Sequence, residues 1–114
     1  MKIYISLPIN GRPEPTFDAR YAAAQRRCAL IISLLRKCDE FRDAEFVHTF
    51  DLNPLGAVTE AQAMGRCIQA VIECDAIFED YDGWTSRGCT VEAETALQYR
   101  KRFYSAAEFC LPRE

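Results

Sequence analysis

Short apolar runs alternate with longer amphipathic segments along this chain, and the alternation restricts its fold more than any other feature. The short runs are rich in β-branched and aromatic residues and cover residues 3–7, 45–50, 75–79 and 103–106. The longer segments have apolar residues at helical spacing and cover residues 16–38, 59–74 and 88–100. Strands that helices connect pair in parallel, so this order predicts an α/β domain with helices on both faces of one sheet.

Helix start signals support this division of the chain. Thr16 or Asp18 can cap the first helix, which we expect to run to about Cys38. Thr59 and Gln62 form a capping box, in which a hydroxyl and an amide three residues apart satisfy the first free N–H groups. The second helix is therefore expected to begin directly after Thr59.

The element order predicts where a ligand binds. We expect one domain over residues 1–114, a flavodoxin-like three-layer fold with a parallel sheet of four or five strands in the order 2-1-3-4. Ligands in such folds lie outside the C-terminal ends of the strands, where the strand order reverses beside strand 1. The loops at residues 8–12 and 80–88 are thus expected to line the crevice.

Charge and cysteine usage restrict the partners. A chain of 114 residues with net charge −3 has room for one core and no general attraction to duplex nucleic acid. The basic pair Arg26-Arg27 is expected on a solvated helix face. No apolar run approaches the roughly 20 residues of a membrane span, and no signal peptide is evident, so we expect a cytoplasmic protein. Six cysteines without CxxC spacing and a single His indicate reduced thiols, with no metal or cofactor.

The most informative residues follow the third strand. Gly88 lets the backbone approach a ligand where the third helix begins, and free N–H groups there favour an anion. Glu92 lies one turn further along, in a position to face the crevice. An acidic residue is also typical of a first helical turn for its interaction with the helix dipole alone. The residues by themselves leave both interpretations of Glu92 open.

A resemblance to the nucleoside 2-deoxyribosyltransferase superfamily, most of all to a small bacterial branch of it, rests on three segments. They are residues 1–9, residues 74–77 and the pattern Gly83-Trp84-x-Ser86-x-Gly88-x-x-x-Glu92-x-x-x-Ala96. The match extends to about residue 105. It implies that Glu92 is a nucleophile that attacks the anomeric carbon of a nucleoside and releases the base. Water or a second base then resolves the covalent glycosyl ester.

Ser86 refines the expected substrate. The transferases that this chain resembles usually carry Asp at that place, whereas the related nucleoside 5′-monophosphate N-glycosidases carry Ser, which helps to bind the phosphate. Asn10, Gly11 and Arg12 resemble the phosphate-binding loop of the same glycosidases. The resemblance therefore favours hydrolysis of a nucleoside 5′-monophosphate slightly over base exchange. For Arg12, an exposed loop cation is an equally good interpretation.

Two residues depart from the superfamily pattern. Cys67 stands where an Asp usually faces the leaving base, and Asp80 or Asp82 is the expected substitute. Glu94 replaces a small Gly on the helix that carries the nucleophile. The alternative function is therefore a non-catalytic nucleotide-binding or sensing module of the same fold.

The remaining candidate residues contribute to binding. Ser6 and Pro8 are expected in the crevice, and Tyr4 matches a position near the sugar in the superfamily, although a first-strand Tyr is also typical of a core. Trp84 can stack on a base or hold a loop in place. His48 ends the second strand and can reach the crevice. The resemblance also implies a homodimer or larger homo-oligomer in which a neighbour completes the pocket.

Overall fold

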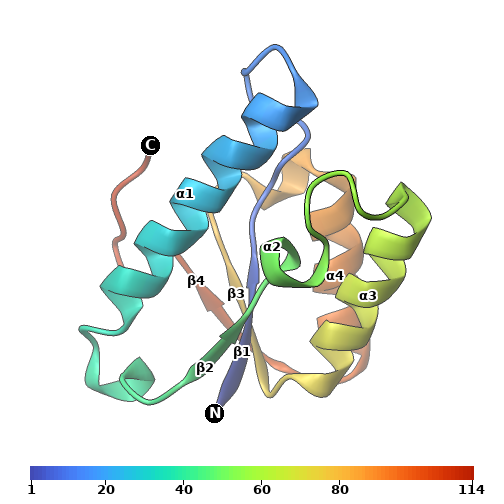
Figure 1. Cartoon of the computed structure of the whole chain (residues 1–114). Coiled ribbons are helices and arrows are strands. Elements are labelled where there is room, and N and C mark those ends of the chain that lie inside the picture. Colours follow the sequence, from blue (N-terminus) through green and yellow to red (C-terminus); the bar gives the residue numbers. More distant parts are fainter.

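Four parallel strands form the central sheet of the computed structural model, which describes all residues 1–114 (Figure 1). They are β1 (Lys2–Ser6), β2 (Glu45–Val47), β3 (Ala76–Glu79) and β4 (Arg102–Ser105), in the order β2-β1-β3-β4. Tyr4 of β1 is in register with Val47 of β2 and with Ile77 of β3. The strand order confirms the prediction and puts the reversal of order beside β1.

Helices cover both faces of the sheet. Figure 1 shows α1 (Phe17–Leu35) on one side and α3 (Glu60–Glu73) with α4 (Arg87–Gln98) on the other. The shorter elements are η1 (Asp39–Phe41), α2 (Thr49–Leu52) and η2 (Gly83–Thr85). Thr16, not Asp18, caps α1 by accepting a hydrogen bond from the backbone N–H of Ala19, and the capping box of Thr59 opens α3 as predicted. None of these helices has the length and apolarity that crossing a bilayer requires.

Alternation along β1 divides the core in two. Ile3, Ile5 and Leu7 pack against the buried face of α1, and Tyr4 packs on the opposite face with residues of α3 and α4. Burying each large apolar side chain of this kind contributes roughly 1.5–3 kcal/mol relative to leaving it in water. Because side chains alternate in a strand, Ser6 lies on the same face as Tyr4. Two hydroxyl groups thus project toward α4.

The second strand is shorter than the pattern 45–50 predicts. β2 ends at Val47, and the chain turns at once into α2. Phe50 is buried in the core, where its ring meets that of Tyr21 edge to face with centroids 5.1 Å apart. Phe50, which the sequence pattern assigned to the second strand, therefore belongs to the helical turn α2. The contact of Phe50 with Tyr21 joins residues distant in the sequence, so the local pattern could not predict it.

All six cysteines are free. Burial raises the pKa of the Cys28 thiol to about 12 and the pKa of Cys74 and Cys89 to about 11. These thiols are therefore protonated at neutral pH and behave as small apolar core residues.

Candidate active site

The Glu92 carboxylate is buried between α4 and β1, with 7 % of the residue exposed. Tyr4 Oη donates to Glu92 Oε2 at 2.7 Å, and Ser6 Oγ donates to Glu92 Oε1 at 2.7 Å. Each carboxylate oxygen is therefore held by one hydroxyl group. The two donors come from the same face of β1, so the strand and the helix together fix the orientation of the carboxylate.

A cavity of about 720 Å³ opens beside Glu92 at the C-terminal end of β1. That volume lies within the range of small-molecule sites. Its wall includes Asn10 and Gly11 from the loop after β1, Ser86 and Gly88 from the start of α4, and Glu92 itself. Residues 9–11 of the first loop and residues 85–88 of the second thus meet at this cavity, whereas the other residues expected from these loops do not line it.

The N-terminus of α4 contributes hydrogen-bond donors to this cavity. Ser86 is the N-cap residue, and its Oγ accepts from the backbone N–H of Cys89 at 3.3 Å. The N–H groups of Arg87 and Gly88 lie in the first turn, where no intrahelical acceptor exists for them. With the positive end of the helix dipole, they suit an anionic group of a ligand.

The electrostatics of Glu92 are those of a carboxylate without a counter-charge. Burial raises its pKa above the ordinary value, while the hydrogen bonds from Tyr4, Ser6 and Cys67 lower it to a lesser extent. Burial, followed by the charge of Glu92, raises the pKa of Tyr4 well above its usual range, so that Tyr4 stays a neutral donor. A buried titratable group with a perturbed pKa beside a cavity is typical of a functional site.

The cavity wall also contains three residues that the sequence analysis did not predict to contact a ligand, namely Asn53, Glu60 and Cys67. Asn53 is 4 % exposed, donates from Nδ2 to Thr49 Oγ1 at 2.9 Å, and has an Oδ1 with no hydrogen-bond partner. Cys67 Sγ lies 3.4 Å from Asn53 Nδ2, and Glu60 is the second carboxylate residue of the wall. In the sequence, Asn53 precedes Pro54 as in a turn, and Glu60 follows the helix cap Thr59. These positions indicate a structural role and give no signal of ligand binding.

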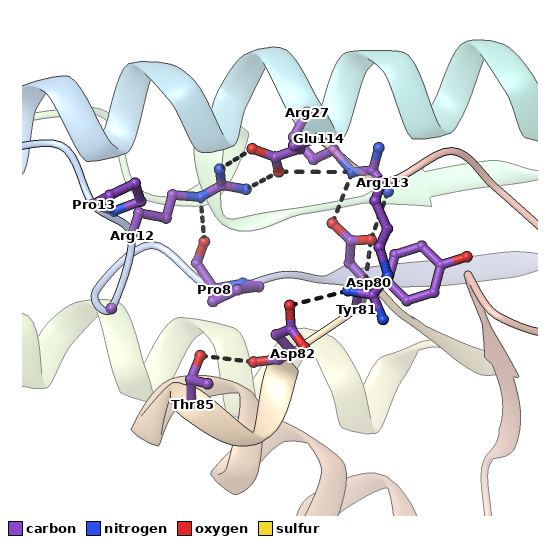
Figure 2. A pocket seen from close by; sticks show the side chains of 11 residues that line it. Pro8, Arg12, Pro13, Arg27, Asp80, Tyr81, Asp82, Thr85, Arg113 and Glu114 are labelled. Atoms are coloured by element: carbon purple, nitrogen blue, oxygen red, sulfur yellow. Dashed lines mark hydrogen bonds and ion pairs between the residues drawn. The ribbon is translucent and has the colours of Figure 1, made fainter.

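Asp80 and Asp82 do not line the cavity beside Glu92; they line a second cavity of about 310 Å³ (Figure 2). Both Asp80 oxygens accept from Arg27, from Nε and Nη2, at 2.9 Å each. Asp82 is exposed and faces Arg113 Nη1 at 3.3 Å. The expectation of a solvated Arg26-Arg27 face is wrong for Arg27, which is buried. Its partner Asp80 directly follows β3 and is distant in the sequence.

The other predicted residues do not line the cavity beside Glu92. Pro8 and Arg12 line the second cavity, where Arg12 Nε donates to the Pro8 carbonyl oxygen at 2.8 Å. Trp84 is 81 % exposed and lines neither cavity. His48 is half-buried, lies outside both cavity walls, and has Nε2 3.4 Å from Asp51 Oδ2.

Comparison of the sequence with protein-family models finds no match, and comparison with curated proteins finds none either. The site is therefore defined by its geometry. It consists of a buried carboxylate with two hydroxyl donors and a helix N-terminus, around a cavity at the strand ends of an α/β fold.

Proposed function

We propose that this protein cleaves the N-glycosidic bond of a nucleoside or nucleoside 5′-monophosphate, by hydrolysis or by base exchange, with Glu92 as nucleophile. The observation that carries the proposal is the buried Glu92 carboxylate at the cavity, held on both oxygens by Tyr4 and Ser6 and paired with no cation. The resemblance of the segment from Gly83 to Ala96 to the nucleoside 2-deoxyribosyltransferases supports the same role.

The reaction has two steps. One Glu92 oxygen attacks the anomeric carbon, the bond from that carbon to the base nitrogen breaks, and its electron pair leaves with the base. Water, or a second base, then attacks the same carbon and releases the Glu92 carboxylate, as in a retaining glycosidase. The departing base takes up a proton or a hydrogen bond. In this proposal Glu60, the other carboxylate of the cavity wall, takes the part first expected of Asp80 or Asp82.

Recognition of the ligand uses the neutral donors of the cavity. Ser86 and the N–H groups at Gly88 hold the 5′-phosphate, since a hydroxyl group beside a helix N-terminus tolerates a negative charge that an Asp would repel. The unpartnered Asn53 Oδ1 accepts a hydrogen bond from an N–H group of the base. Ser86, through the resemblance to the nucleoside 5′-monophosphate N-glycosidases, slightly favours hydrolysis of a 5′-monophosphate over base exchange.

A second candidate is a nucleotide-binding or sensing module without turnover. It is favoured by Cys67, a thiol at the position where a carboxylate would assist the departing base. In either case we propose that the chain works as a homodimer or larger homo-oligomer, for which Trp84, Leu97 and Tyr99 offer exposed apolar surface.

Turnover of pooled nucleosides and nucleotides, with free bases detected by mass spectrometry, tests the proposal. The wild type is expected to release a base, and Glu92→Gln to lose turnover by several orders of magnitude while still binding the ligand. Glu94→Gln is the matched control, because Glu94 is exposed and lies about 200° around the helix from Glu92. Full activity in Glu92→Gln excludes the nucleophile. Binding without cleavage in every protein supports the sensing module.

A further inference from the structure

The polar groups of the cavity beside Glu92 differ between the elements that form its wall. At the start of α4, the free backbone N–H groups of Arg87 and Gly88 offer hydrogen-bond donors. On the side of α2 and α3, Asn53 and Glu60 offer acceptor oxygens. A ligand that fits both parts of the wall therefore has one end rich in acceptors and another end that carries N–H donors.

The packing around Asn53 fixes the orientation of its side-chain amide. Asn53 Nδ2 donates to Thr49 Oγ1 at 2.9 Å and to the Ala63 carbonyl oxygen, which can only accept, at 3.5 Å. Exchanging Nδ2 and Oδ1 would bring two acceptors together, so Oδ1 is the atom that has no partner. The backbone N–H of Asn53 also donates to the Thr49 carbonyl oxygen at 2.7 Å. The free acceptor is thus held in place before a ligand binds.

Glu60 lies one helical turn away from this contact. It precedes Ala63 by three residues in α3, and side chains at that spacing share one helix face, with Cβ atoms about 5–6 Å apart. Cys67 follows Ala63 by four residues on the same face, and all three line the cavity. Glu60 carries an acceptor oxygen in either protonation state. Asn53 and Glu60 therefore form a pair of acceptors along one face of α3.

An exocyclic amino group is the part of a base that satisfies two acceptors, because it carries two N–H donors. Adenine, cytosine and guanine have such a group, whereas uracil, thymine and hypoxanthine in a nucleoside have a single N–H. A buried acceptor that faces an oxo group stays unpaired, and sites of this kind discriminate strongly. We propose that the substrate is a nucleotide whose base carries an exocyclic amino group, and that Asn53 and Glu60 select it. This inference rests on the proposed function and adds the class of base.

Calorimetry with matched pairs of ligands tests the class of base, in Glu92→Gln so that binding is measured without turnover. One pair is adenosine and inosine 5′-monophosphate, and the other is cytidine and uridine 5′-monophosphate. The members of each pair differ by an amino or an oxo group at one ring carbon. In at least one pair, we expect the amino member to bind about tenfold more tightly or better. The pair that is discriminated identifies a purine or a pyrimidine substrate.

Two further substitutions in Glu92→Gln assign the preference to these residues. Asn53→Leu removes the acceptor at similar size, and Glu60→Gln adds an amide that can donate to an oxo group, so each is expected to lose most of the preference. Glu60 is exposed, so Glu60→Gln decides the question if Asn53→Leu does not fold, and exposed Glu94→Gln is the control that keeps the preference.

Equal affinity within both pairs, or tighter binding of the oxo members, overturns the inference and leaves the proposed function in place. A preference that survives both substitutions overturns the assignment to Asn53 and Glu60. Absence of binding by all four monophosphates also overturns the inference, whereas release of a base from pooled nucleosides and nucleotides by the wild type decides the proposed function separately.

Discussion

At the scale of single residues, Glu92 lies where burial opposes the negative charge of its carboxylate. Hydrogen bonds to a charged group contribute about 1.5–3 kcal/mol each, and Glu92 accepts two from Tyr4 and Ser6. Burial nevertheless outweighs them, since the pKa of Glu92 is raised. The fold therefore keeps a carboxylate where its ionised form is disfavoured, and the chain contains no cation paired with it.

Glu92→Gln is expected to stabilise the protein at neutral pH. The raised pKa means that the folded protein retains a proton which the unfolded chain, with a Glu pKa of about 4.3, has lost. The contribution of Glu92 to stability is thus fully present below that unfolded pKa and is lost as the pH rises through the folded pKa. Glu79, whose pKa is also raised by burial, is common to both proteins and cancels in the difference.

Urea unfolding at several pH values measures this effect. The free energy of unfolding of Glu92→Gln minus that of the wild type is expected to grow as the pH rises, and exposed Glu94→Gln serves as the control without such a trend. A difference that does not change with pH contradicts the assignment of the raised pKa to Glu92.

Some of these residues could be predicted from the sequence, and others could not. The position of Glu92 near the crevice could, because it follows Gly88 by one helical turn, whereas its proposed role rests on the family resemblance. The role of Asp80 could not, since its partner Arg27 comes from a helix 53 residues earlier in the chain. Asn53 is a candidate ligand-binding residue because its buried Oδ1 has no hydrogen-bond partner, and only the folded structure shows this.

At the scale of elements, the N-terminus of α4 is a structural cap and a proposed ligand site at once. The sequence predicts the start of this helix to within a residue, because Ser86 and Gly88 are local signals, whereas the turn of α2 depends on the packing of Phe50. Thr16 caps α1 in the same way, but it lines neither cavity. The two caps therefore form a matched pair for substitution.

Ser86→Ala and Thr16→Ala are each expected to lower the free energy of unfolding by about 1 kcal/mol, because each removes a cap. Only Ser86→Ala is expected to weaken binding of a nucleoside 5′-monophosphate, on the order of tenfold, since it also removes a hydroxyl group from the cavity. Thermal unfolding and calorimetry measure the two effects. Equal affinity of both variants for the monophosphate argues against a phosphate position at α4.

At the scale of the whole molecule, Arg27 and Asp80 connect α1 to the end of β3 through a buried ion pair. Arg27 also donates to the Pro112 carbonyl oxygen at 2.6 Å, so the segment after β4 is held at the same place. This position lies in the wall of the second cavity, which Glu92 does not line. We therefore assign Asp80 a structural role.

Asp80→Asn is expected to destabilise the fold by about 3–5 kcal/mol, because it leaves Arg27 buried without its counter-charge. Replacing both residues by Leu is expected to recover much of that loss. Turnover per folded molecule should stay close to that of the wild type. Chemical unfolding and activity of the folded fraction measure the two quantities, and normal stability with lost turnover would restore the catalytic role expected from the sequence.

The mass of the intact protein, quenched during turnover, tests the role of Glu92 most directly. The wild type is expected to gain the mass of one glycosyl unit, with its phosphate where the substrate is a 5′-monophosphate, and proteolytic mapping to place the added mass on Glu92. Glu92→Gln, which cannot form the ester, is expected to show no added mass. Release of base by a wild type whose mass stays unchanged, or an adduct that persists in Glu92→Gln, contradicts the account.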